Sequence, residues 1–141
     1  MSARSSDGGS WILDMLQYGE LQDEHHREIS TLLLSLLEVM DSFDRVLAEA
    51  PLTDDTRGVT GTCQLIARQL GTVLERAKVR PIQCVGRALD LDAHEVVGVR
   101  AIVPEQASVV VEVVRRGYEW DGQLLRAAQV IVGCSSEENS S

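Results

Sequence analysis

The stretch that decides the fold is SVVVEVVRRGYEWDGQLLRAAQVIV, which runs from Ser108 to Val132. On both sides of its centre it is rich in β-branched and aromatic residues and alternates between apolar and polar, as strands with one buried face do. At the centre stands Asp121-Gly122, and both residue types tolerate the positive φ of a two-residue hairpin turn. The stretch therefore predicts a β-hairpin with strands at 108–120 and 123–132.

The turn also predicts the register of the hairpin. Counting outward pairs Trp120 with Gln123, Tyr118 with Leu125, Val113 with Val130, and Val111 with Val132. A core face is then made of Val109, Val111, Val113, Val130 and Val132. The opposite face mixes the residue types that anchor interfaces, so we expect it to form a binding surface together with the hairpin tip. Its members are Glu112, Val114, Arg116, Tyr118, Trp120, Gln123 and Leu125.

Two more short strands are predicted upstream, at Ile82–Val85 and Glu95–Ile102, so residues 79–134 form a small β domain. Before Val79 the apolar period is helical instead. One helix is expected from about Trp11 to Ala50 and a second up to about Lys78, joined by a loop that begins at Pro51.

Both predicted helices carry an apolar seam with the alternating three- and four-residue spacing of a heptad pattern. The seam residues are Ile29, Leu32, Leu36, Val39, Phe43 and Val46 in the first helix and Ile66, Leu70 and Val73 in the second. Leu33, Leu37 and Met40 widen the first seam, and a two-helix hairpin would leave that second side exposed. We therefore predict that residues 11–78 form a dimerisation region, in which two chains build a four-helix bundle. An intrachain core without a dimer is the alternative.

The fold class expected from these elements is α+β, with an N-terminal helical hairpin followed by a small all-β domain that ends in a β-hairpin. Residues 1–10 and 135–141 are polar and rich in Ser, with Gly in the first segment, and are predicted to be disordered tails.

The composition narrows the range of partners. The net charge is −9, from 22 acidic and 13 basic residues, and aromatic residues make up only 4%. Such a surface repels phosphate backbones and anionic lipids, so we expect neither nucleic acid nor membrane as a partner. Arg115, Arg116 and Arg126 form a local basic cluster that suits an acidic partner.

The cysteines and the apolar runs indicate the compartment. Three cysteines at irregular spacing argue against a disulfide framework and fit a reducing environment. No apolar run approaches the ~18 residues of a membrane helix. The N-terminal segment is too acidic for a transit peptide. The expected location is the cytoplasm.

The sequence offers little for catalysis or metal binding. His25 and His26 are neighbours on a helix and point in different directions, with no further ligand at a suitable spacing. His94 and Glu95 would face opposite sides of a strand, so they cannot easily share an acid–base site. We find no phosphate-binding glycine loop and no catalytic triad. We therefore expect no enzyme, no metal site and no cofactor.

Three blocks of the sequence resemble the GrpE family, in family order. Val111–Val130 is similar to its C-terminal hairpin. In the family this hairpin has a strand, then Lys/Arg-Gly-Tyr and an Asn-Gly turn. The turn is followed by Arg, two further residues and Arg-Pro/Ala-Ala. Cys84–Val97 resembles the family segment Gly-x-x-Phe/Leu-Asp-Pro-x-x-His-Glu-Ala. Leu36–Leu47 resembles the helix segment Leu-Leu-Pro-Val-Leu-Asp-Asn-Leu-Glu-Arg-Ala-Leu. Together the resemblance covers roughly Leu32 to Val132.

The resemblance implies a homodimeric nucleotide exchange factor for a DnaK-class heat-shock chaperone. One β domain would insert between the lobes of the chaperone's ATPase domain and hold its cleft open, so that ADP leaves. Such a factor makes and breaks no covalent bond, because it acts by binding the open conformer more tightly than the closed one. The alternative is a GrpE-fold dimeric scaffold or binding module without exchange activity.

The resemblance also implies chaperone-contact residues at the matching positions. They are Leu89, Val114, Arg116, Tyr118, Asp121, Gly122, Gln123 and Arg126. The chain departs from the family pattern at several points, and two of these departures, at the hairpin tip and in the first helix, motivate the alternative. Gln123 stands where the family has Arg, and Leu91 stands where it has Pro. The first helix, expected to begin no earlier than about Trp11, is shorter than the long N-terminal helix of the family.

Overall fold

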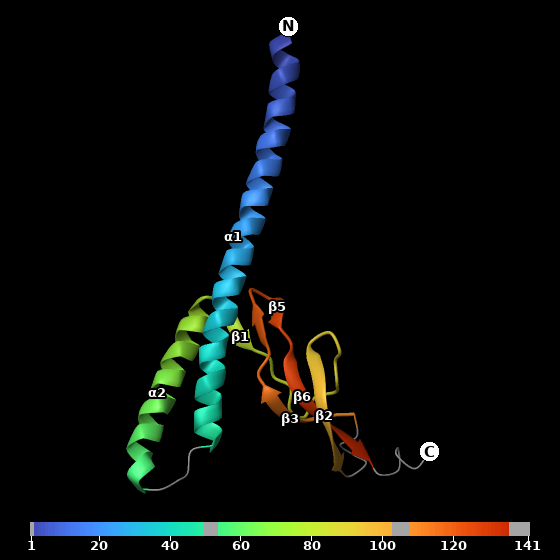
Figure 1. The fold of residues 1–141 in the computed structure, drawn as a ribbon. Coiled ribbons are helices and arrows are strands. Elements are labelled where there is room, and N and C mark those ends of the chain that lie inside the picture. Colours follow the sequence, from blue (N-terminus) through green and yellow to red (C-terminus); the bar gives the residue numbers. More distant parts are fainter. Residues whose placement is uncertain (1, 50–53, 103–107, 136–141) are drawn as a thin grey trace. The chain divides into compact units, whose positions relative to one another are not determined.

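The computed structural model describes residues 2–49, 54–102 and 108–135. Its elements are α1 (Ser2–Glu49), α2 (Asp54–Arg76), β1 (Val79–Pro81), β2 (His94–Ile102), β3 (Val110–Arg115), β4 (Tyr118–Trp120), β5 (Gln123–Arg126) and β6 (Ala128–Ser135) (Figure 1). The expected α+β class is confirmed, since two helices precede a small β domain that contains antiparallel strands. The chain divides into two compact units, one up to Leu36 and one from Leu37 onward.

The first unit is the N-terminal part of α1. This helix begins at Ser2, so two expectations are wrong for residues 2–10: that they form a disordered tail, and that the first helix begins no earlier than about Trp11. Extending a formed helix costs little, because each added residue gains one backbone hydrogen bond. In this unit Leu33 is buried, whereas the predicted seam residues Ile29 and Leu32 are exposed.

In the second unit the two helices bury the apolar side of α1 that was expected to stay exposed unless a second chain covered it. Leu37 and Met40 of α1 are buried, as is Leu74 of α2. The predicted seam residues Val39, Val46, Ile66 and Val73 are instead 44 to 51% exposed. The expectation that Leu37 and Met40 stay exposed without a second chain is therefore wrong. This side of the helices faces the β domain, since Met40 and Leu74 line a groove together with Val79 and Tyr118.

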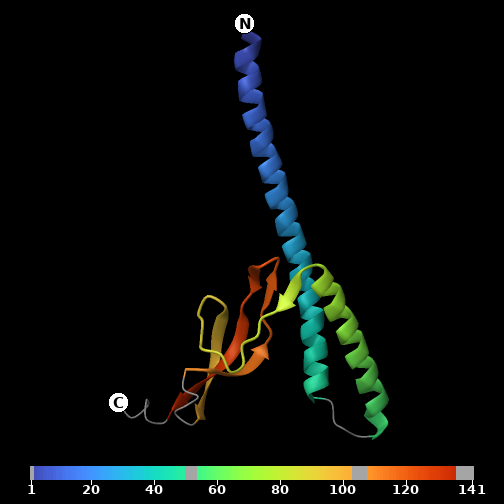
Figure 2. The same cartoon turned by 180° about the vertical axis from the view of Figure 1, so that it is seen from behind.

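The strands of the second unit form two three-stranded sheets, which Figures 1 and 2 show from opposite sides. Their strand orders are β1-β4-β5 and β2-β6-β3. β2 pairs with β6 in parallel, and the other pairings are antiparallel. The predicted strand at Ile82–Val85 is absent, because the regular pairing of this segment ends at Pro81.

The predicted hairpin exists, but it is shared between the two sheets. Trp120 pairs with Gln123 and Val113 with Val130, as expected. Tyr118, however, pairs with Arg126 rather than Leu125, and Val132 pairs with Val110 rather than Val111. The register shifts at irregularities in both ladders, because a bulge adds a residue to one strand only.

Gly117 allows the hairpin to pass from one sheet to the other. It is buried between β3 and β4, and a Cβ atom at this position would lie 2.5 Å from the backbone nitrogen of Ala128. Only glycine permits such a close approach of two backbones. The two legs of the hairpin therefore cross closely at this point.

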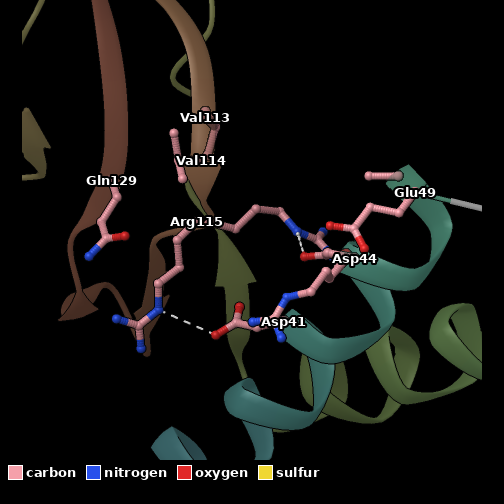
Figure 3. A pocket seen from close by; sticks show the side chains of 10 residues that line it. Asp41, Asp44, Glu49, Val113, Val114, Arg115 and Gln129 are labelled. Atoms are coloured by element: carbon pink, nitrogen blue, oxygen red, sulfur yellow. Dashed lines mark hydrogen bonds and ion pairs between the residues drawn. The ribbon is translucent and has the colours of Figure 1, made fainter. Parts of the chain in front are cut away.

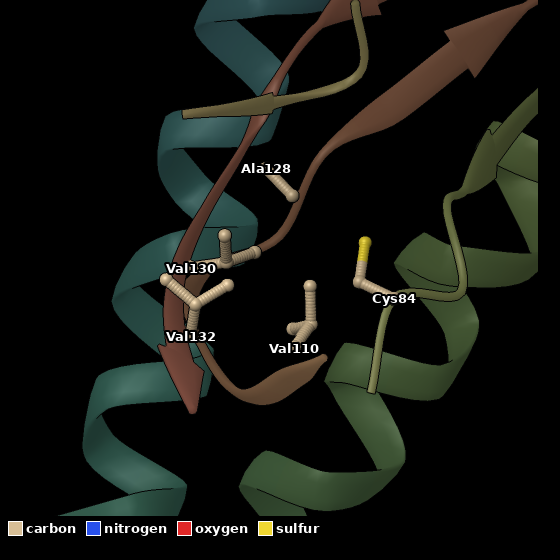
Figure 4. Packing of buried hydrophobic residues seen from close by; sticks show 5 residues of the cluster. All are labelled: Cys84, Val110, Ala128, Val130 and Val132. Carbon is tan, nitrogen blue, oxygen red and sulfur yellow. The ribbon is translucent and has the colours of Figure 1, made fainter. Parts of the chain in front are cut away.

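The core of the β domain lies on the β2-β6-β3 sheet. Cys84, Val110, Ala128, Val130 and Val132 are buried together (Figure 4). Val130 and Val132 were expected there, whereas Val110 takes the place predicted for Val111. Burial raises the pKa of the Cys84 thiol, so this residue behaves as a small apolar side chain.

Two predicted segments lie partly or wholly outside the described residues. The predicted tail 135–141 lies outside them except for Ser135, which ends β6. Residues 51–53 of the predicted loop also lie outside them, and α2 already begins at Asp54.

Within residues 2–49, 54–102 and 108–135, neither helix has the apolar stretch that a transmembrane span requires.

Candidate functional site

Five charged residues of the second unit meet beside the last turns of α1. This ionic cluster consists of Asp41, Asp44, Arg115, Arg116 and Arg126. Arg126 donates from both terminal nitrogens to the two carboxylate oxygens of Asp41, with Nη1 2.8 Å from Oδ2. Arg115 adds a bond from Nε to the same Oδ2 at 3.3 Å, and Figure 3 shows its side chain reaching toward the aspartate.

A second two-pronged contact joins Arg116 to Asp44. The Nε of Arg116 lies 2.8 Å from Oδ2 of Asp44, and Nη2 donates to Oδ1. This pair is half-exposed, with 38% of the arginine and 36% of the aspartate side chain accessible. The Arg126 side chain is only 8% exposed. The two contacts therefore differ in how far they are removed from water.

The ring of Tyr118 lies close to both Arg116 and Arg126. Its centre is 5.8 Å from the guanidinium carbon of Arg116 and 5.4 Å from that of Arg126, within the range of cation–π attraction. The residue is buried, and its hydroxyl has no hydrogen-bond partner in the described part of the chain. Burial raises the pKa of Tyr118, so the hydroxyl stays neutral.

The charges of the cluster stabilise one another. Burial opposes the ionisation of Asp41, but the hydrogen bonds and charges of Arg126 and Arg115 outweigh it and lower the pKa of this carboxyl. The hydrogen bond to Asp44 raises the pKa of Arg116. Asp41 and Arg116 are therefore ionised at neutral pH.

The helix pattern explains why two aspartates point toward the β domain. Buried Leu37 and Met40 are followed at helical spacing by Asp44 and then by half-buried Leu47. Asp44 thus occupies a place where an apolar residue would continue the stripe. Neither aspartate was predicted from the sequence, although an acidic residue in an apolar stripe is a recognisable signal.

The hairpin tip has the turn that the sequence predicted. Asp121 and Gly122 both adopt positive φ, at 51° and 81°. The backbone N–H of Asp121 donates to the carbonyl oxygen of Lys78 at 3.0 Å, and the two side chains approach to 3.5 Å. The turn is therefore tied to the start of β1, while Gln123 beside it is exposed.

A hollow beside the ionic cluster leads to an exposed part of β3. This open pocket has a volume of about 690 Å³, and Val113, Val114 and Gln129 line it together with cluster residues (Figure 3). Val114 is 56% exposed. It therefore presents apolar surface next to a hollow, a combination that suits a protein contact.

The structure divides the predicted contact residues into two groups. Val114, Asp121, Gly122 and Gln123 are exposed. The others are engaged within the chain. Leu89 packs against the β-domain core, and the expectation that Tyr118 lies on an exposed face is wrong. The basic cluster that was expected to meet an acidic partner meets Asp41 and Asp44 of its own chain.

No group of three His, Cys, Asp or Glu side chains that could hold a metal ion occurs among the described residues.

Comparison with known proteins identifies the family. The GrpE family model matches residues 18–134 of this chain. The chain belongs to the GrpE family. The matched residues of this GrpE-family chain include the ionic cluster, the hairpin tip and all six strands, apart from the last residue of β6.

Relatives named Protein GrpE occur in several bacteria. The protein from Shewanella sp. (strain MR-4) is 32% identical over 108 residues, which cover 74% of this chain and 53% of the relative. The protein from Synechococcus elongatus is 32% identical over 111 residues, 78% of this chain and 54% of the relative. The protein from Parabacteroides distasonis is 26% identical over 156 aligned positions, 93% of this chain and 80% of the relative. This GrpE-family chain spans about half the length of the first two.

Proposed function

We propose that this chain is a GrpE-like adenyl-nucleotide exchange factor. It binds the ATPase domain of a DnaK-class chaperone, opens its cleft and accelerates ADP release in protein folding and the stress response. The observation that carries this proposal is the match of the GrpE family model to residues 18–134, which include the whole hairpin.

The proposed contact is the hairpin surface, defined as Val114, Asp121, Gly122 and Gln123. All four residues are exposed. Val114 supplies apolar area, and the tip supplies polar groups held by a tight turn. A stiff hairpin is useful here, because an exchange factor must bind the open ATPase domain better than the closed one. The factor performs no covalent chemistry.

We also propose that two copies associate through their helices and act in the cytoplasm. Exposed Val39 and Val46 on α1, and Ile66 and Val73 on α2, support the association because they present apolar surface on both helices of the second unit. Two helical hairpins of this kind can complete a four-helix bundle.

The first test measures release of a fluorescent ADP analogue from the DnaK-class chaperone of the same organism, by stopped flow. We expect a dose-dependent acceleration. Val114→Asp should raise the concentration needed for half-maximal acceleration about tenfold, because an interface anchor contributes on the order of 1–2 kcal/mol. Gln123→Arg restores the family residue at the tip and should lower that concentration.

The matched control for this test is Val99→Asp. Val99 is 63% exposed on β2 and lies outside the hairpin surface, so the same change there should leave the acceleration intact. If Val99→Asp and Val114→Asp behave alike, the hairpin surface is not the contact. If the folded wild-type chain leaves ADP release unchanged, exchange activity is excluded.

A second candidate function is a GrpE-fold scaffold or binding module without exchange activity. The observation that favours it is the internal engagement of Arg116, Tyr118 and Arg126, three of the residues that the family resemblance assigns to the chaperone. A chain that binds the chaperone but does not accelerate ADP release would support this candidate.

A further inference from the structure

We propose that Asp41 and Asp44 are positioning residues that fix the β4–β5 hairpin against the last turns of α1. They act through Arg126 and Arg116, and so set the orientation in which the hairpin surface meets its partner. The effect on a partner rests on the proposed function. The positioning itself is a property of this chain alone.

The first argument is where the arginines stand on the hairpin. Arg116 lies just before β4, and Arg126 is the last residue of β5. They therefore mark the two open ends of the hairpin, opposite the Asp121-Gly122 tip. Asp41 and Asp44 lie three residues apart on α1, a spacing that places both on one face of the helix. One helix face thus holds both legs of the hairpin.

The second argument is the shape of the contacts. Each aspartate binds its arginine through two nitrogens. Such a planar fork fixes orientation as well as distance, which a single hydrogen bond does not. Two forks at separate points on one face leave the hairpin little freedom to rotate about either of them.

The third argument is that the two forks are linked. Nε of Arg126 donates to the backbone oxygen of Arg116 at 2.9 Å. The ring of Tyr118 lies within cation–π distance of both guanidinium groups. Tyr118 also pairs with Arg126 in the β4–β5 ladder. A change at one fork is therefore transmitted to the other.

The two forks differ in what their loss should do. Removing the Asp41 carboxylate leaves the buried charge of Arg126 without its acidic partner, and this destabilises the fold. Removing Asp44 exposes the half-accessible Arg116 to water, so the chain should remain folded. Asp44→Asn is therefore the variant that separates orientation from stability.

The decisive measurement is the set of backbone residual dipolar couplings of the full-length chain, without any partner. In the wild type, one alignment tensor should fit the amides of residues 37–49 together with those of β4 and β5. In Asp44→Asn the hairpin couplings should shrink and require a tensor of their own, while the thermal midpoint changes little. A merely local structural role would leave the common tensor intact.

Glu38→Gln is the control, because it removes the same charge from an exposed position of the same helix outside the ionic cluster. It should preserve the single tensor. Arg116→Lys keeps the charge but loses the fork, so it should behave like Asp44→Asn. A single tensor for both Asp44→Asn and Arg116→Lys overturns the proposal.

A double-mutant cycle that measures binding to the chaperone's ATPase domain gives an independent readout. Asp44→Asn and Arg116→Gln should each weaken binding roughly threefold to tenfold, and the double variant should be no weaker than the singles, since both remove one contact. If Arg116 instead contacts the chaperone, Asp44→Asn frees it and tightens binding, which contradicts the proposal. If the wild type does not bind, the proposed function fails, and the dipolar couplings still decide whether the hairpin is positioned.

Discussion

At the scale of single residues, Asp41 shows how this domain uses charge. It accepts hydrogen bonds from Arg126 and Arg115, which come from different strands, and it does so at a half-buried position. The two arginines outweigh the effect of burial, and the pKa of Asp41 therefore lies below its ordinary value of 3.8. Its carboxylate is more stable in the folded than in the unfolded chain.

A pH dependence of stability follows from this shift. A carboxyl whose pKa is lowered by folding stabilises the fold above its unfolded pKa, and this contribution is lost as the pH falls through the folded pKa. We expect Asp41→Asn to lower the free energy of unfolding by about 2 kcal/mol at pH 7. The difference from wild type should shrink below about pH 4. Urea unfolding between pH 7 and pH 3 measures it, with Glu38→Gln as the control. A difference that stays constant across this range would contradict the assignment.

At the scale of elements, the two sheets depend on one crossing point. β3 leads into β4 through Gly117, and β5 leads into β6 past Ala127, so both legs of the hairpin change sheets at the same level. The close approach of Gly117 to Ala128 makes this possible. The crossing also places Arg116 and Arg126, which flank it, beside α1.

Gly117→Ala should therefore be strongly destabilising. Its Cβ would meet the backbone of Ala128, which cannot move aside as a flexible side chain could. We expect a loss of about 3 kcal/mol in the free energy of unfolding, at the upper end of overpacking effects. Gly61→Ala is the matched control. Its Cβ would meet open space on α2, so it should raise stability by up to about 1 kcal/mol. Both values come from denaturant unfolding, and equal stability of the two variants would refute the crossing.

The sequence predicts local features of these elements well and distant ones poorly. The Asp121-Gly122 turn and the innermost pair Trp120–Gln123 follow from neighbouring residues, and both are confirmed. The pairing predicted for residues further from the turn is partly wrong, because a bulge cannot be recognised in an alternating sequence pattern. The parallel pairing of β2 with β6 joins segments that are distant in sequence, so periodicity could not reveal it.

The candidate site follows the same division. The exposed tip was predicted from its turn residues. The partners of Arg116 and Arg126 were not, since Asp44 and Asp41 lie 72 and 85 residues away in the chain. Charge patterning within a short window indicates a basic cluster, but it cannot indicate which acidic residues neutralise it.

At the scale of the whole molecule, the exposed residues of the helices matter most. Within the second unit, Val39 and Val46 on α1 and Ile66 and Val73 on α2 are about half-exposed, although they recur at core-like spacing. A chain that buries Leu37, Met40 and Leu74 on one side and leaves these on another presents apolar surface to water. A second copy would cover that surface.

Self-association should therefore be visible in solution. We expect a dimer by sedimentation equilibrium and a thermal midpoint that rises with protein concentration, because association stabilises only the folded chain. Ile66→Glu should raise the dissociation constant at least about tenfold, since burying an unpaired charge costs well over 1.4 kcal/mol. Val99→Glu places the same charge on exposed β2 as the control. A wild-type chain that sediments as a monomer at all concentrations would rule the dimer out.

The order of strands in the β2-β6-β3 sheet also affects how this protein is made. The central strand, β6, is the last of the described strands to be synthesised, and in this sheet β2 pairs only with it. While the ribosome still holds Ala128–Ser135, the helices can already close their local hydrogen bonds, but β2 and β3 have no central partner. Nascent chains therefore carry two valine-rich strands with open edges until translation of β6 is complete, and the sheet forms only after the last strand leaves the exit tunnel.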